Sequence, residues 1–310
     1  MTRLLDAWSR FWFAPVDARS LGVMRITLAI LLIASHLAWI GDLTLLSDAG
    51  PVSTQTILDG SSYLRWSYLD GLSGDALATA HLLGLIPLVG MLVGWQSRLM
   101  CIAALVVQVA LHHRAPWLQH GGDRILRISV LALCFAPTGA ALSVDAWLAR
   151  RRCGIDASPL VPVTAHRLVQ IQLMVVYLFT GIAKLSGATW IGGTALYYAL
   201  SSRTFQRFPH LLEPVLSSWP GQLALTASTW VTLAWELVFA AMVLFPRTRR
   251  WALIIGLAVH VGIAATMMVG SFSFATTWCY LAFLPTAWVA KTQSRRWQQL
   301  PRPSAPAPGR

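Results

Sequence analysis

The sequence predicts an all-α fold, a polytopic transmembrane helical bundle, and three observations support this prediction. Of the 310 residues, 56% are hydrophobic and only 12% are charged, whereas charged residues make up about 25% of an average soluble domain. The mean hydropathy is +0.59. Long apolar segments alternate with short clusters of arginine, a pattern typical of membrane-spanning helices and of the cytoplasmic loops between them.

The net charge of +12 does not indicate a nucleic-acid-binding protein, because the basic residues lie in short clusters between apolar segments. That distribution is the topology signal of a multi-pass protein of the cell membrane, which in a bacterium is the inner membrane. We therefore expect the lipid bilayer as a partner and no nucleic acid. The distribution of basic residues around the predicted spans places both termini in the cytoplasm.

The chain divides into three predicted parts. Residues 1–18 form an amphipathic segment at the membrane interface, which Pro15 ends and after which Asp17 caps the next helix. Residues 19–290 form the transmembrane domain, and the Pro-rich residues 291–310 form a basic disordered tail. About eight spans are expected, at residues 21–40, 76–95, 99–112, 124–144, 170–184, 223–245, 251–268 and 272–289. Two longer segments, 41–75 and 186–222, are expected on the non-cytoplasmic side.

The segment from Gln170 to Thr194 is the most informative part of the sequence. It begins as an apolar helix, yet Gln170, Tyr177 and Lys184 recur at intervals of seven residues and therefore share one helical face. An ionisable group inside a membrane-spanning segment indicates a functional site. The alternative is that Lys184 only extends from the helix end to the membrane interface.

Three more ionisable side chains lie within or beside the predicted spans, namely Glu236, His260 and His120. Glu236 is one of only two glutamates in the chain. It is expected to form an ion pair with Arg25 or Lys184, or to tune the reactivity of Lys184. His260 on its own is more typical of a hydrogen-bonded core histidine. A histidine near a desolvated lysine would favour the neutral amine, which can act as a general base.

Three polar residues are predicted to have structural roles. Asp123 is expected to be the N-cap of the span at 124–144 and to pair with Arg127 one turn later. Arg25 is expected to extend to the cytoplasmic interface or to pair with a carboxylate. No metal is expected, because the histidines between positions 112 and 120 lack the i, i+4 spacing of a helical ligand pair.

Four stretches carry a resemblance to a known family. They read FAPVDARSLGVMRITLAILL, RAPWLQHGGDRILR with LSVDAWL, VYLFTGIAKLSGATWIGGTAL, and WELVFAAMVLFPRTRRWALIIGLAVHVGIAATMMVGSFSF. With them, the chain from about Phe13 to Ala287 resembles the horizontally transferred transmembrane (HTTM) domain family, which includes the vitamin K-dependent gamma-carboxylases. The third stretch is the most specific, because it is similar to the carboxylase segment that contains the active-site lysine.

The resemblance implies chemistry that uses a reduced naphthoquinone, a vitamin K-type quinol, together with oxygen. In the carboxylases a lysine deprotonates the quinol, oxygen converts it to an epoxide, and a strong base formed in that step removes a proton from a peptide glutamate. Carbon dioxide then adds to the carbanion. Lys184 is accordingly the expected catalytic base. The residues expected to bind or position the quinol are His260, Glu236, Tyr177, Gln170 and His120.

The sequence departs from the carboxylases in ways that bear on its function. Ala183 precedes Lys184 where the carboxylases have a pair of lysines, and no large extra-membrane region follows the predicted spans. The resemblance therefore supports quinol chemistry more than glutamate carboxylation, with an exported peptide or a lipid as the acceptor. A non-catalytic scaffold or partner of a maturation enzyme is the first alternative. A transporter is the second, although no internal repeat favours it.

Overall fold

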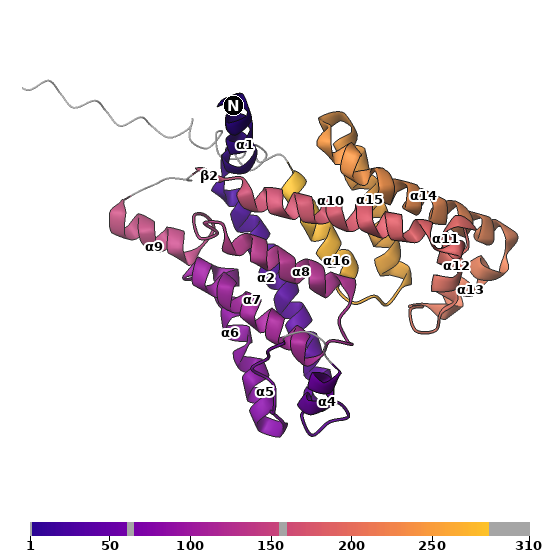
Figure 1. The fold of residues 1–310 in the computed structure, drawn as a ribbon, viewed down its shortest axis with the longest axis horizontal. Helices are drawn as coiled ribbons and strands as arrows, with labels where there is room; N and C mark the ends of the chain where they lie inside the picture. Colours follow the sequence, from indigo (N-terminus) through magenta and orange to yellow (C-terminus); the bar gives the residue numbers. More distant parts are fainter. Residues whose placement is uncertain (1, 61–64, 155–159, 285–310) are drawn as a thin grey trace, which may run out of the picture.

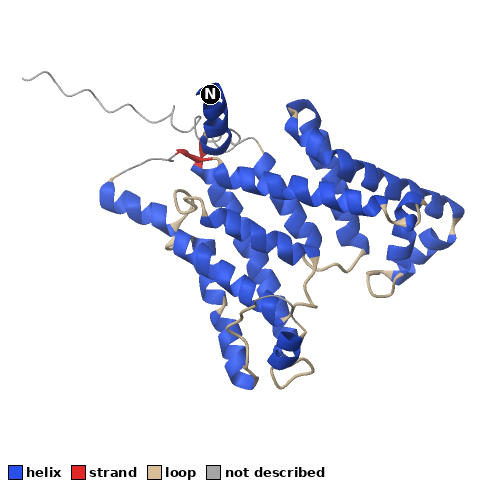
Figure 2. Ribbon diagram, in the orientation of Figure 1, coloured by secondary structure: helices blue, strands red, loops and turns tan. Residues whose placement is uncertain are grey.

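The computed structural model describes residues 2–60, 65–154 and 160–284 of the chain (Figure 1). Helices dominate these residues, and strands are confined to one short pair (Figure 2). The all-α prediction is therefore confirmed. The predicted tail at 291–310 and the end of the predicted span at 272–289 lie outside the described residues.

The first half contains one long helix, α2 (Ala18–Ala38), which follows α1 (Thr2–Phe13) and packs against α6 and α8. Asp17 caps α2 as predicted, because its Oδ1 accepts a hydrogen bond of 2.9 Å from the backbone amide of Arg19. The other elements of this half are η1 (Trp39–Asp42), α3 (Leu43–Leu46), α4 (Thr54–Asp59), α5 (Gly74–Leu83), α6 (Leu85–Val93), α7 (Ser97–Arg114), α8 (Gly121–Cys134) and α9 (Val144–Cys153).

The second half is built on three long helices, α10 (Thr164–Leu185), α14 (Trp219–Leu244) and α15 (Pro246–Thr266). α14 packs against both α10 and α15. The shorter elements are α11 (Ala188–Ile191), α12 (Ala195–Ser201), α13 (Pro209–Ser217), α16 (Phe272–Trp278) and η2 (Cys279–Phe283).

Within the described residues, five helical stretches are long and apolar enough to cross a membrane, which fits a polytopic protein. They are Ala18–Leu46, Gly74–Val93, Thr164–Leu185, Trp219–Leu244 and Pro246–Thr266. The span predicted at 124–144 is wrong in length, because α8 ends at Cys134 and rises about 21 Å, less than the roughly 30 Å of a hydrocarbon core. Pro137 follows closely and cannot continue a helix. The count of eight spans and the cytoplasmic termini stay predictions.

A short sheet that the sequence did not predict joins the beginnings of two long helices. β1 (Pro15–Asp17) pairs antiparallel with β2 (Leu160–Pro162), and these strands lead directly into α2 and α10. Figure 1 shows α1, the sheet and the starts of α2 and α10 together at one end of the molecule. α4 and α5 lie toward the far end of α2, and α11 to α13 lie toward the far end of α10.

Arg25 differs from both of its predicted roles. Its side chain is fully buried (0% exposed), so it does not reach the interface. Nη1 donates to the Met91 carbonyl at 3.2 Å and Nη2 donates to the Leu142 carbonyl at 2.5 Å, so its acceptors are not carboxylates. Met91 lies in the last turn of α6, where carbonyls lack helical partners. Arg25 therefore caps α6 and ties it to α2.

Replacing Arg25 with methionine should destabilise the protein, because the buried Met91 carbonyl and the part-buried Leu142 carbonyl lose their donor while the side-chain volume is largely kept. We expect a loss of about 2 kcal/mol or more in the free energy of unfolding. Denaturant unfolding in detergent micelles, followed by tryptophan fluorescence, measures this change. The exposed Arg98 provides the control, and equal losses for Arg25→Met and Arg98→Met would contradict the capping role.

Candidate functional site

The centre of the site is an ion pair between α10 and α14. Lys184 lies in the last turn of α10, and its Nζ is 2.5 Å from each carboxylate oxygen of Glu236 in α14. The Lys184 side chain is 21% exposed and that of Glu236 is 10% exposed. The hydroxyl of Thr180 donates to the same carboxylate at 3.2 Å. Of the two partners predicted for Glu236, the structure therefore selects Lys184.

Two neighbours shape this ion pair. Gly181 faces α14 so closely that a Cβ at this position would lie 3.1 Å from Leu237 and 3.3 Å from the Cβ of Glu236. The absence of a side chain at Gly181 thus allows the two helices to approach. Trp190 of α11 covers the other side, with its ring centroid 4.7 Å from the Lys184 Nζ. This cation–π contact also favours a positive charge on the lysine.

A second polar group, centred on Tyr177, lies two turns before Lys184 on α10. The Tyr177 hydroxyl is 2.8 Å from Nε2 of His260 in α15 and 2.7 Å from the hydroxyl of Tyr280 in η2. The other ring nitrogen of His260, Nδ1, is buried and has no hydrogen-bond partner in the described part of the chain. The structure therefore brings together four of the predicted residues: Tyr177, Lys184, Glu236 and His260.

Tyr280 is the residue of this cluster that the sequence analysis missed. It lies in a 3₁₀ segment with no helical periodicity that relates it to Tyr177. One feature of the sequence could have identified it: Tyr280 is the only tyrosine in the otherwise apolar span predicted at 272–289. A phenol in an apolar segment usually finds a hydrogen-bond partner when buried.

Gln170 lies away from the cluster, although it shares a helix with Tyr177 and Lys184. Fourteen residues separate Gln170 from Lys184, which corresponds to about 21 Å along the helix axis. Its Nε2 donates to the Ala282 carbonyl at 2.6 Å, and its Oε1 accepts from Arg167 at 2.8 Å. The bond to Ala282 holds η2 against the first half of α10. A quinol-binding role for Gln170 stays a prediction.

His120 begins α8, where Asp123 was predicted to be the N-cap. His120 is the N-cap, and its Nδ1 accepts a hydrogen bond of 3.0 Å from the Gly122 amide. Asp123 is the third helical residue, and its carboxylate accepts from the His120 amide at 3.0 Å. The prediction was wrong by three residues because Gly121 and Gly122, typical of turns, are already helical in this reciprocal capping box. The Asp123–Arg127 pairing stays a prediction.

His120 and Asp123 also line a pocket of about 380 Å³. A buried hydroxyl, Oγ of Ser271, lies at this pocket and has no hydrogen-bond partner among the residues described. Phe272 connects the pocket to the cluster, because its ring is 5.6 Å from that of His260 and would be 3.3 Å from a Cβ at Gly121. The other lining residues are Leu31, Ala34, Ser35, Ala38, Trp39, Asp42, Leu118, Gly270 and Phe274.

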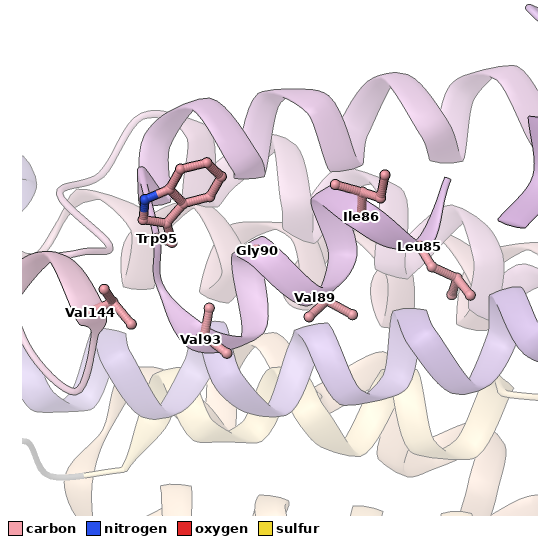
Figure 3. A pocket seen from close by; sticks show the side chains of 7 residues that line it. All are labelled: Leu85, Ile86, Val89, Gly90, Val93, Trp95 and Val144. Atoms are coloured by element: carbon pink, nitrogen blue, oxygen red, sulfur yellow. The ribbon is translucent and has the colours of Figure 1, made fainter. Parts of the chain in front are cut away.

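A second hollow, of about 530 Å³, runs along α6 (Figure 3). Its lining is almost wholly apolar and contains no titratable side chain, so it offers no group for acid–base chemistry. Figure 3 shows its lining residues Leu85, Ile86, Val89, Gly90, Val93, Trp95 and Val144.

The long apolar helices and the polar cluster buried among them define a polytopic helical membrane protein. The chain belongs to the HTTM domain family, whose model matches residues 13–288. This match confirms the resemblance drawn from the four sequence stretches.

Two curated relatives, both from Bacillus subtilis (strain 168), are similar to part of the chain. The uncharacterized protein YitO is 31% identical over 113 residues, which are 36% of this chain and 35% of the relative. The sporulation-delaying protein SdpB is 30% identical over 98 residues, which are 30% of this chain and 29% of the relative. The alignments thus span about a third of each relative. No solved structure matches.

A double-mutant cycle should detect the ion pair as a coupling between Lys184 and Glu236. Lys184→Met and Glu236→Gln should each lower the free energy of unfolding by about 2 kcal/mol, because each leaves a polar or charged partner without its counterpart. The double variant should lose less than the sum, with a coupling of about 1 kcal/mol or more. Unfolding in detergent measures all four proteins, and strictly additive losses would show that the pair does not form in solution.

Proposed function

We propose that this protein carries out lysine-base chemistry on a reduced naphthoquinone with oxygen, and that Lys184 and Glu236 act together as the base. The observation that carries the proposal is the half-buried Lys184–Glu236 pair beside the Tyr177–His260 cluster. Membership of the HTTM domain family supports it, because the family match extends over both groups of residues. The acceptor that we propose is an exported peptide or a lipid.

The pocket at His120 suits a reduced naphthoquinone. Such a molecule presents a flat apolar ring system with two hydroxyl groups, and the pocket of about 380 Å³ falls within the usual range of about 300–1,000 Å³ for ligand sites. His120 and the unpartnered hydroxyl of Ser271 are the groups that would bind the hydroxyls, between apolar residues such as Trp39 and Phe274. When bound, the quinol supplies an acidic hydroxyl and the electrons that reduce oxygen.

In this proposal Lys184 becomes a base by passing a proton to its partner. An ammonium group that faces a carboxylate in an ion pair keeps its proton, so the resting pair cannot accept another one. Transfer of one proton from Nζ to a Glu236 oxygen leaves a neutral amine and a neutral carboxyl group. Thr180 holds the carboxyl group in place throughout.

Tyr177 and Tyr280 have a positioning role in the same proposal. Their hydroxyls and Nε2 of His260 form one continuous chain of hydrogen bonds. This chain fixes the orientation of the imidazole and leaves Nδ1 as the ring nitrogen without a partner in the described residues. His260 also contacts Phe272, whose ring borders Gly121 next to His120.

The proposal predicts that turnover depends on the amine of Lys184. Purified protein in nanodiscs should epoxidise a reduced naphthoquinone in the presence of oxygen, and Lys184→Met should lower the rate by about 100-fold or more, the range for loss of a general base. Glu236→Gln should also lower it strongly, because the ammonium group of Lys184 then has no carboxylate to take its proton. Product analysis by mass spectrometry measures the rate, with the exposed Arg203 replaced by glutamine as the control. Full turnover by a folded Lys184→Met variant would exclude the mechanism.

The second candidate is a non-catalytic scaffold, and the same ion pair favours it. A pair that joins α10 to α14 stabilises the bundle without any chemistry. In that case the shape of the interface matters and the amine does not. Gly181→Leu would then abolish function, because its side chain would meet Leu237, whereas a folded Lys184→Met variant would remain functional. The opposite pattern favours the enzyme.

A further inference from the structure

We propose that the hollow along α6 binds one acyl chain of an anionic phospholipid, whose phosphate group contacts Arg151 in the last turn of α9. This hollow, of about 530 Å³, is the one drawn in Figure 3. It shares no lining residue with the His120 pocket or with the Lys184 cluster. The inference therefore does not depend on the function proposed above.

The lining of the hollow suits a hydrocarbon chain. Ile86, Val89 and Val93 of α6 line it, and their side chains are exposed in the folded chain. They belong to Gly74–Val93, one of the helical stretches that are long and apolar enough to cross a membrane. In a bilayer such a surface meets hydrocarbon chains rather than water. Leu85 and Val93 both line the hollow, and their spacing corresponds to about 12 Å along the helix axis.

The hollow ends where this apolar stretch ends. Beyond Val93 its lining consists of Trp95 and Val144. Trp95 is exposed and lies two residues after the stretch, a position typical of tryptophan at the membrane interface. Val144 is the first residue of α9. The part of the site that would hold the acyl chain therefore meets the interfacial part at the start of α9.

One face of α9 continues from the hollow toward positive charge. Val144, Trp147 and Arg151 recur at intervals of three and four residues, so they share this face. The Arg151 guanidinium carbon is 4.1 Å from the centroid of the exposed Trp147 ring. Arg150 and Arg152 lie in the same last turn. An apolar surface, an aromatic ring and a cation thus follow one another in the order of the acyl chain, interface and phosphate of a phospholipid.

Asp145 holds α9 in a fixed position beside the hollow. Its carboxylate accepts hydrogen bonds from the backbone amides of Gln96 at 2.8 Å and Ser97 at 2.7 Å, and from the Ser97 hydroxyl at 2.7 Å. The Asp145 amide donates to the Gly94 carbonyl at 3.0 Å. These bonds attach the start of α9 to the turn between α6 and α7. The site is therefore largely formed before a lipid binds, which lowers the entropy lost on binding.

The charge of α9 selects an anionic headgroup. Both oxygens of Asp145 are occupied, and within the described residues no ion pair involves Arg151. Basic clusters beside membrane spans attract anionic lipids of the cytoplasmic leaflet, the side on which residues 150–152 are predicted to lie. The forked guanidinium group can donate two parallel hydrogen bonds to phosphate oxygens. A zwitterionic headgroup carries its own positive charge, which these arginines repel.

Phosphatidylglycerol and phosphatidylcholine, both with dioleoyl chains, are the probes that test the site. The purified full chain in detergent is titrated with each lipid, and native mass spectrometry measures the affinity for the first bound molecule. The anionic lipid should bind about 10-fold more tightly, and Arg151→Gln should weaken its binding by about 5-fold, the effect of one basic residue at an anionic surface. Arg250→Gln is the matched control and should leave binding unchanged. Arg250 also stacks on a tryptophan, Trp251, at 5.3 Å, but neither residue lines the hollow.

A second pair of variants tests the hollow itself. Val89→Trp fills it and should weaken binding of the anionic lipid about 10-fold, because the larger side chain takes the place of the acyl chain. Val261→Trp, at an exposed valine of α15, should leave binding unchanged. Both Val89 and Arg151 are exposed, so their variants should fold. Equal affinities of the wild type for the two lipids would overturn the proposal, as would equal effects of the Arg151 and Arg250 variants or of the two tryptophan variants.

Discussion

The ion pair between Lys184 and Glu236 links the two helices on which the buried polar groups of the second half depend. A charged side chain inside an apolar bundle has little water to solvate it, so each of these residues requires the other. The pair joins α10 to α14, and Tyr177, on the same face of α10 as Lys184, contacts His260 and Tyr280. The stabilising contact is also the one that base chemistry would have to change, because an ammonium ion must first give up its proton.

Much of this site could be predicted from the sequence, because charges are rare in it and helices are periodic. Lys184, Glu236 and His260 are conspicuous in segments that otherwise suit lipid, and the seven-residue spacing places Tyr177 on the face of Lys184. Periodicity orders residues along one helix only. It could not show that Glu236 meets Lys184 rather than Arg25, since that choice depends on how separate helices pack.

The features that the sequence analysis missed all depend on irregular backbone or on contacts between distant segments. Tyr280 lies in a 3₁₀ segment without a periodic face, and His120 replaces Asp123 as the cap because two glycines adopt helical geometry. Arg25 donates to the backbone carbonyls of Met91 and Leu142. Every residue has such a carbonyl, so the sequence does not indicate which ones will accept. The paired strands are only three residues long, too short for an alternating pattern.

The short sheet has a consequence for the order in which the chain can assemble. Its first strand, Pro15–Asp17, precedes the first long helix, and its second strand, Leu160–Pro162, lies about halfway along the chain. During synthesis the first strand therefore cannot pair with the second until about half of the protein has left the ribosome. Closing so long a loop carries an entropic penalty that grows only slowly with length. The early helices thus enter the membrane before β1 has its partner strand, and the sheet forms only once β2, at the start of α10, has been synthesised.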